Sequence, residues 1–178
     1  MQLANINKPK TKPGESKLAE LQDAQSNTLS LPNTGMAVIN DIGEWNDVHP
    51  MNKLEAANRL YLASLKVAYK ENDIVFSGPT LSKTEIKDNS IVLYFKNIGS
   101  GLIAKETGKL AHFAIADESK KYVWADAVIE GDKIIVSSKQ IGHPKYIRYA
   151  WADNPVGANL YNKEGLPASC FNTEKNKF

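Results

Sequence analysis

The hydrophobic pattern of this 178-residue chain changes near residue 73, and this change limits the folds open to it. Before it, apolar residues recur every three or four positions in residues 17–29 and 52–69, which predicts two helices. After it, short runs rich in β-branched and aromatic residues alternate with turn residues, which predicts strands. We therefore expect an α/β part in residues 1–73 and a β-rich part in residues 74–178.

The first part has the alternation of an α/β fold with a parallel sheet. Residues 36–40 (MAVIN) form an apolar run between turn signals, which predicts a buried strand between the two helices. Ser16 is expected to cap the first helix. The second helix has one apolar stripe, formed by Leu54, Ala57, Leu60, Tyr61, Leu65 and Ala68. If the α/β part is incomplete, we expect such apolar helix faces to be exposed. Residues 1–5 resemble the end of a second strand, and these two pieces alone would be only a fragment of such a sheet.

The second part has the strand spacing of a β-sandwich. Strands are predicted at residues 91–95, 112–116, 122–124, 133–137 and 146–151. The polar segments at residues 87–90 and 130–133 are expected to be hairpin turns.

The composition argues against several classes of function. The chain has 22 Lys and Arg against 20 Asp and Glu, so no strong field favours nucleic acid or an anionic membrane. Its apolar runs are far shorter than the ~20 residues of a membrane helix. The single cysteine, Cys170, and three scattered histidines give no metal-site spacing, so neither metal nor cofactor is expected. Cys170 is either a buried inert thiol or a reactive one.

The segment richest in chemistry is the loop of residues 41–50 (DIGEWNDVHP) after the predicted strand. Ligands of open α/β sheets bind at that edge. A histidine beside a carboxylate is the base half of a nucleophilic triad, and Asp47 and His49 have this arrangement. A capping Asp and a surface His in a polar loop are the alternative. The other histidines, His112 and His143, are expected to be structural.

Aromatic residues mixed with amides follow the last long strand. Tyr149, Trp151 and Tyr161 could stack on sugar rings, or they could belong to the core of the β-rich part and its closing loop.

The chain resembles the C-terminal portion of the sialate O-acetylesterase family, which belongs to the SGNH (GDSL-like) hydrolases. The resemblance rests on several runs: residues 2–5 (QLAN), 31–38 (LPNTGMAV), 41–50, 148–151 (RYAW), 154–155 (NP) and 160–168 (LYNKEGLPA). It implies the C-terminal fragment of a three-layer α/β hydrolase domain in residues 1–73, which carries the Asp-x-His-Pro loop, and a β-sandwich-like domain in residues 74–178.

The same resemblance implies a carbohydrate acetylesterase that removes O-acetyl groups from sialic acid by a Ser-His-Asp mechanism without metal. His49 would be the general base and Asp47 its orienting partner, although the spacing is one residue tighter than the common Asp-x-x-His block, where this chain has Asn46. A backbone carbonyl is the other candidate for the role of the acid. The Gly-Gln-Ser-Asn-like block that carries the nucleophile is absent, and we expect the chain alone to be inactive.

Two consequences concern partners. The serine is expected to come from a missing N-terminal segment or a partner chain, and an exposed sheet edge could lead to oligomers. The resemblance implies a periplasmic, secreted or lysosomal location. The alternative is a non-catalytic carbohydrate-binding or structural β-sandwich module attached to such a hydrolase.

Overall fold

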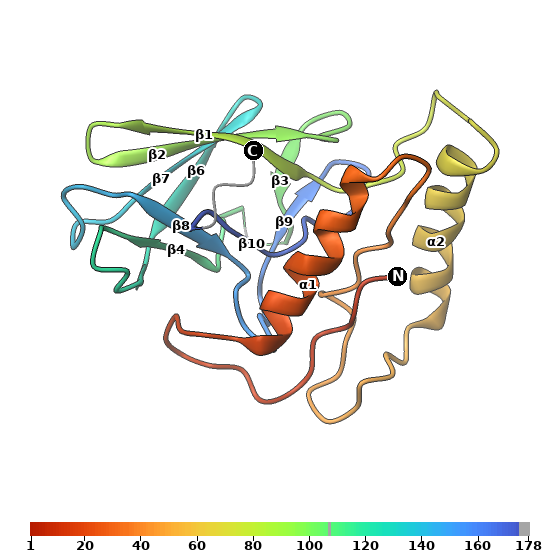
Figure 1. Cartoon of the computed structure of the whole chain (residues 1–178), viewed down its shortest axis with the longest axis horizontal. Coiled ribbons are helices and arrows are strands. Elements are labelled where there is room, and N and C mark those ends of the chain that lie inside the picture. The colour runs from red at the N-terminus through yellow and green to blue at the C-terminus, as the bar shows by residue number, and fades with distance from the viewer. Residues whose placement is uncertain (107, 175–178) are drawn as a thin grey trace.

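Two helices lie at one side of a set of antiparallel sheets in the computed structural model, which describes residues 1–106 and 108–174 (Figure 1). Helix α1 (Lys17–Asn27) and the short 3₁₀ helix η1 (Thr28–Ser30) lie between the sheets and helix α2 (Lys53–Val67). The N-terminal segment runs next to α2, because Ala4, Ile39 and Ala56 share a small buried cluster.

The strands form three antiparallel sheets in the described residues. The first has the order β1 (Thr80–Lys87), β2 (Ser90–Lys96), β7 (Lys133–Ser137), β6 (Asp126–Glu130). The second has the order β10 (Phe171–Asn172), β8 (Tyr146–Tyr149), β4 (Phe113–Ala116), β5 (Val123–Trp124). The third pairs β3 (Leu102–Ala104) with β9 (Leu160–Asn162). The three-layer hydrolase domain and the separate β-sandwich stay predictions.

Each helix begins at a residue whose side chain accepts a hydrogen bond from a backbone N–H of the first turn. The Ser16 hydroxyl accepts from the N–H of Ala19 at 3.0 Å, which confirms the predicted cap of α1. Asn52 Oδ1 accepts from the N–H of Glu55 at 3.1 Å and caps α2. Helix α2 begins at Lys53, shortly after the loop of residues 41–50 that carries His49.

The apolar stripe of α2 is largely exposed among the described residues. The buried residues of α2 are instead Ala56, Arg59 and Ala63, which lie on another face of the helix. Leu54 is 74% exposed and Tyr61 is 61% exposed. The reason is that α2 packs on the N-terminal segment through small residues, and nothing in the described residues covers its larger apolar side chains.

The predicted strand at residues 36–40 is not a strand. Residues 37–40 are buried but belong to no strand, and the N–H of Gln2 donates to the Ala37 carbonyl at 2.9 Å. A strand needs a ladder of such bonds with a neighbour, and this one bond does not make a ladder. The segment nevertheless leads directly into the loop of residues 41–50.

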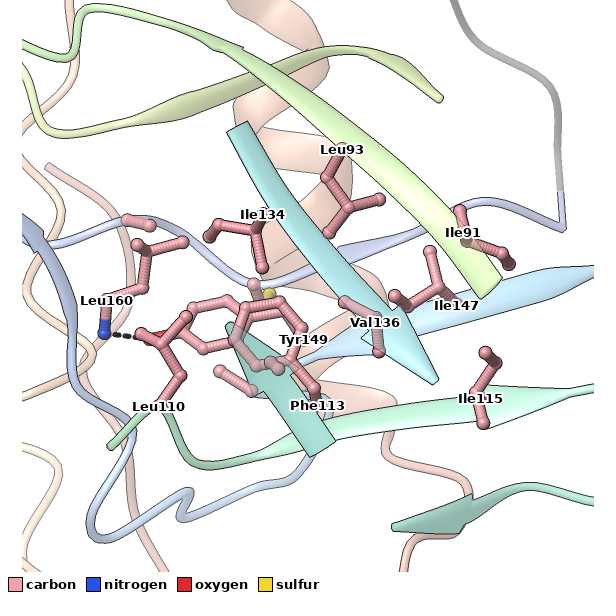
Figure 2. Close-up of a cluster of buried hydrophobic side chains, with 14 of the residues drawn as sticks. Ile91, Leu93, Leu110, Phe113, Ile115, Ile134, Val136, Ile147, Tyr149 and Leu160 are labelled. Carbon is pink, nitrogen blue, oxygen red and sulfur yellow. Dashed lines mark hydrogen bonds between the residues drawn. The ribbon is translucent and has the colours of Figure 1, made fainter. Parts of the chain in front are cut away.

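The main core lies between the two four-stranded sheets. Figure 2 shows apolar side chains of β2, β7, β4 and β8 meeting in one cluster, which contains Ile91, Leu93, Phe113, Ile115, Ile134, Val136, Ile147 and Tyr149. The Tyr149 hydroxyl accepts from the N–H of Leu160 at 2.8 Å, so the buried phenol has a partner. Ala19 of α1 reaches the same cluster, which fixes α1 against the sheets.

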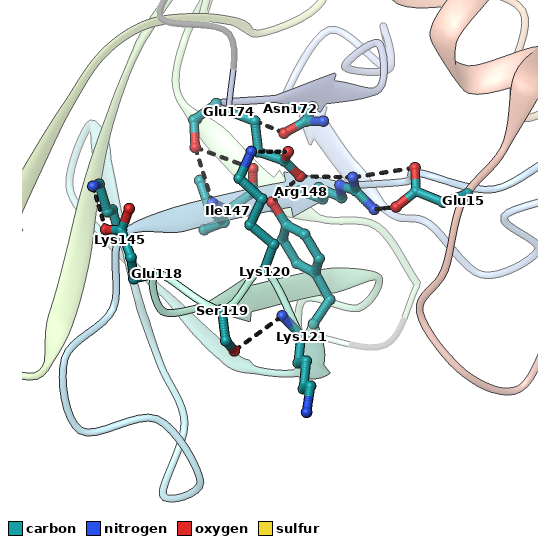
Figure 3. Close-up of polar contacts among 12 residues, drawn as sticks. Glu15, Glu118, Ser119, Lys120, Lys121, Lys145, Ile147, Arg148, Asn172 and Glu174 are labelled. Atoms are coloured by element: carbon teal, nitrogen blue, oxygen red, sulfur yellow. Dashed lines mark hydrogen bonds and ion pairs between the residues drawn. The ribbon is translucent and has the colours of Figure 1, made fainter.

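The segment before α1 is tied to the second sheet by an arginine of β8. Arg148 donates to Glu15 Oε1 at 2.9 Å and to Glu174 Oε1 at 2.7 Å (Figure 3). Its guanidinium lies 4.0 Å from the centre of the Tyr122 ring. Because the Arg148 side chain is only 5% exposed, these charged partners offset much of its lost hydration. In the described residues, no helix is long and apolar enough to cross a membrane.

Candidate functional site

A buried carboxylate anchors the start of the loop of residues 41–50. Arg59 of α2 donates to Asp41 Oδ1 at 2.6 Å and to Oδ2 at 2.8 Å, and also to the Val38 carbonyl at 2.7 Å. The Tyr161 hydroxyl of β9 donates to Asp41 Oδ2 at 2.8 Å. Burial, followed by the charge of Asp41, raises the pKa of Tyr161, so its hydroxyl stays protonated and donates. One carboxylate thus joins the loop, α2 and β9.

Close contact with the N-terminal segment holds the next turn of the loop. The N–H of Gly43 donates to Asn5 Oδ1 at 2.7 Å. A Cβ atom at residue 43 would lie 2.2 Å from the Asn5 carbonyl oxygen, which leaves room for glycine alone. Asn5 Nδ2 donates to Asn154 Oδ1 at 2.6 Å, and the N–H of Asn7 donates to the Trp45 carbonyl at 2.8 Å.

The structure brings Asp47 and His49 together. Their ring–carboxylate contact joins His49 Nδ1 and Asp47 Oδ1 at 3.0 Å, and the backbone N–H of His49 donates to the same oxygen at 2.7 Å. The backbone hydrogen bond from His49, followed by that of its ring, lowers the pKa of Asp47, which stays ionised at neutral pH. Nδ1 therefore carries the proton of a neutral ring, and Nε2 is left to accept a proton.

The pair is open to solvent. The His49 side chain is 79% exposed and the Asp47 side chain is 53% exposed. Among the described residues, no serine hydroxyl or cysteine thiol is hydrogen bonded to His49. Ser100, which lies in a Gly-Ser-Gly turn, instead donates its hydroxyl to Glu164, as does its backbone N–H at 2.9 Å. This turn is held by a carboxylate and has no histidine beside its serine.

The other two histidines and the cysteine show no arrangement for catalysis in the described residues. His112 Nε2 lies 2.6 Å from the Val156 carbonyl oxygen, and burial lowers the pKa of His112, which keeps the ring neutral. His143 is exposed. Cys170 is buried and unpaired, and burial raises the pKa of its thiol to about 12. The thiol is therefore of the inert kind. Within the described part of the chain, no cluster of acidic, histidine or cysteine side chains could hold a metal ion.

The three aromatic residues do not form one surface. Tyr149 is 1% exposed and Tyr161 is 4% exposed, and both hydroxyls are used inside the protein. Trp151 is half-buried and lies over Arg148, with 5.3 Å between the guanidinium carbon and the ring centre. Sugar stacking on all three rings is therefore not possible in this arrangement, and two of them have core roles.

A polar cleft of about 510 Å³ lies next to this loop, and we call it the junction cleft. The loop and α2 contribute Asp41, Asn52, Glu55 and Arg59, whereas the β-rich part contributes Lys105, Glu106, Tyr161 and residues 155–159. Sequence reasoning missed Arg59, Lys105 and this use of Tyr161. Only the charge of Arg59 on an otherwise apolar helix face could have indicated a buried partner.

Comparison with known proteins gives the class first. The chain superposes on the crystal structure of a carbohydrate acetylesterase from Xanthomonas citri with a TM-score of 0.92 and 41% identity. The match covers 98% of this chain and 40% of that one. No protein-family model matches the chain.

Sequence similarity then gives the family. The chain is 38% identical over 154 residues to the sialate O-acetylesterase of Mus musculus and 26% identical over 152 residues to that of Homo sapiens. Both matches cover 79% of this chain, but only 28% of the mouse protein and 29% of the human protein. This chain is thus a relative of the sialate O-acetylesterases, of whose length it spans less than a third.

Proposed function

We propose that this chain is the acid–base half of a carbohydrate acetylesterase, which hydrolyses O-acetyl esters of sugars such as sialic acid. The observation that carries the proposal is the contact of 3.0 Å between His49 Nδ1 and Asp47 Oδ1, at the end of an anchored loop. The names of its relatives, carbohydrate acetylesterase and sialate O-acetylesterase, agree with it. The chain would then correspond to the C-terminal part of an SGNH hydrolase and the domain after it.

The chemistry follows the Ser-His-Asp scheme, with a serine supplied by another segment or chain. His49 Nε2 takes the serine proton as the serine oxygen bonds to the acetyl carbonyl carbon. When the bond between the acetyl carbonyl carbon and the sugar oxygen breaks, the imidazolium gives this proton to the leaving sugar oxygen, which departs as a hydroxyl group. Water, deprotonated by His49, then releases acetate and restores the serine. Asp47 keeps the proton of the ring on Nδ1 and stabilises the imidazolium.

The outward stripe of α2 supports a role for a covering partner. Leu54, Leu60 and Tyr61 are 74%, 41% and 61% exposed, and they lie on the helix that follows His49. Contiguous apolar surface of this kind marks interfaces. A segment that covers this face would come close to the loop of residues 41–50 and could bring the serine with it. Left uncovered, the face would favour association between copies of the chain.

Complementation tests this function directly. The chain is mixed with the Xanthomonas citri acetylesterase from which the matching region has been deleted, and acetate release from a chromogenic acetyl ester and from O-acetylated sialic acid is measured. Activity is expected only in the mixture. His49→Ala should lower it by a factor on the order of 10⁶, as in well-studied serine triads.

His143→Ala is the matched control, because His143 is an exposed histidine outside the loop. It should leave the activity of the mixture unchanged. Activity of the chain alone, or a mixture that tolerates His49→Ala, would contradict the proposal. A carbohydrate-binding module has less support, since Tyr149 and Tyr161 are buried.

A further inference from the structure

The junction cleft has the size and position of a substrate subsite. Its volume of about 510 Å³ lies within the usual range for small-molecule sites, roughly 300–1,000 Å³. Asn52, three residues after His49 in the sequence, lines the cleft and caps the helix that follows. A molecule bound there would therefore lie beside the loop that carries the proposed base.

Most of the charge in the cleft is already paired. Arg59 binds both oxygens of Asp41, and its Nε donates to Glu55 Oε1 at 2.8 Å. The Arg59 side chain is 5% exposed and that of Asp41 is 10% exposed, so this group forms a fixed floor. Such a floor positions a ligand and offers it little free charge.

Lys105 is the exception. Its ammonium nitrogen lies 4.6 Å from the centre of the Tyr161 ring, at the wall of the cleft. Among the described residues it has no carboxylate within ion-pair distance, and its neighbour Glu106 makes no ion pair with it. The cation–π contact holds the ammonium group toward the cleft at small cost. A cation held in this way is available to an anionic ligand.

We propose that Lys105 recognises the carboxylate of an acidic monosaccharide bound in the junction cleft, which makes it a specificity-determining residue. The inference rests on the proposed function, because it names the part of the substrate that this site would select. Glu55 and Glu106 can accept hydrogen bonds from ligand hydroxyls, and Asn52 can donate from its amide.

The balance of charge limits the ligand further. The cleft holds the carboxylates of Asp41, Glu55 and Glu106 against the cations of Arg59 and Lys105, a formal excess of one negative charge. This excess repels every anion, and most strongly a polyanion such as a nucleotide, so a ligand with a single carboxylate has to gain more from Lys105 than it loses to this repulsion. A sugar with one carboxylate and several hydroxyls satisfies both the free cation and the free acceptors. A neutral sugar would leave Lys105 without its partner.

The test measures binding by the full chain, and needs no catalysis. The methyl α-glycoside of N-acetylneuraminic acid and its neutral methyl ester are titrated into ¹⁵N-labelled protein, and amide shifts are followed by NMR. The acid is expected to shift the amides of Lys105, Tyr161 and Asn52, and to bind about fivefold more tightly than the ester, as for a partly exposed ion pair. Lys105→Gln should remove this preference.

Lys121→Gln is the matched control, since Lys121 is exposed and does not line the cleft. It should leave the preference for the acid intact. Equal binding of acid and ester by the unaltered chain, shifts outside the cleft, or an equal effect of the two substitutions would overturn the assignment. If the chain prefers the acid but the complemented enzyme releases no acetate, the proposed esterase function is wrong while the role of Lys105 stands. Failure of the proposed function can therefore be told apart from failure of this inference.

Discussion

Breaking the ion pair between Arg59 and Asp41 from the arginine side should be among the most destabilising single substitutions in this chain. Both side chains are at most 10% exposed, and Arg59 also donates to the Val38 carbonyl and to Glu55. In Arg59→Met, Asp41 would keep only the hydroxyl of Tyr161 as a side-chain partner. Removing one partner of a buried pair costs about 3–5 kcal/mol, because the remaining charge stays buried and uncompensated. We expect a loss of this size.

Urea unfolding followed by circular dichroism measures it, with the free energy of unfolding extrapolated linearly to water. Lys17→Met is the control, because Lys17 forms an ion pair with Glu20 while 94% exposed, and such pairs contribute at most ~1 kcal/mol. The double variant Arg59→Met/Asp41→Leu should recover part of the loss, since it removes the orphaned charge. A cost below about 1 kcal/mol for Arg59→Met would refute the view that this pair anchors the loop.

Two further predictions concern titratable groups. Although burial raises the pKa of Glu174, hydrogen bonds from Tyr122 and Lys120 and the charge of Arg148 lower it overall. The lowered pKa of Glu174 stabilises the folded chain above the pKa of the unfolded state, near 4.5, and this stabilisation is lost as the pH falls through the lower folded pKa. Glu174→Gln should therefore flatten the acid side of a plot of unfolding free energy against pH. An acid side that stays unchanged in the variant would contradict this prediction. With a pKa of about 12, the Cys170 thiol should resist Ellman's reagent at pH 8 until denaturant is added, and rapid labelling of the folded chain would show the thiol to be accessible.

Much of the local structure could be predicted because neighbouring residues decide it. The cap at Ser16 needs only the amide three residues later, and the hairpin turn at Gly131 needs only a residue that tolerates a φ of 61°. The contact between Asp47 and His49 is local for the same reason, since they are two positions apart in the sequence. Local patterns of this kind can be recognised without knowing how the rest of the chain folds.

Strand β1 shows where such reasoning stops. Its sequence, TLSKTEIK, is largely polar, and the residue pattern did not predict a strand there. It becomes a strand because β2 offers it a ladder of backbone partners, from Thr80 opposite Lys96 to Lys87 opposite Ser90. Residues 36–40 are the reverse case, because this apolar run has no neighbouring ladder in the described residues and does not form a strand.

The sequence by itself determined the change of pattern near residue 73, the two helices, the cap at Ser16 and the pairing of Asp47 with His49. Only the tertiary structure decided which face of α2 is buried, and that Asp41, Arg59 and Tyr161 meet in one network. The physical reason is that these residues lie far apart in the sequence. Asp41 and Tyr161 are 120 positions apart, and their meeting depends on how β9 packs against the N-terminal segment, a long-range arrangement that no local pattern specifies.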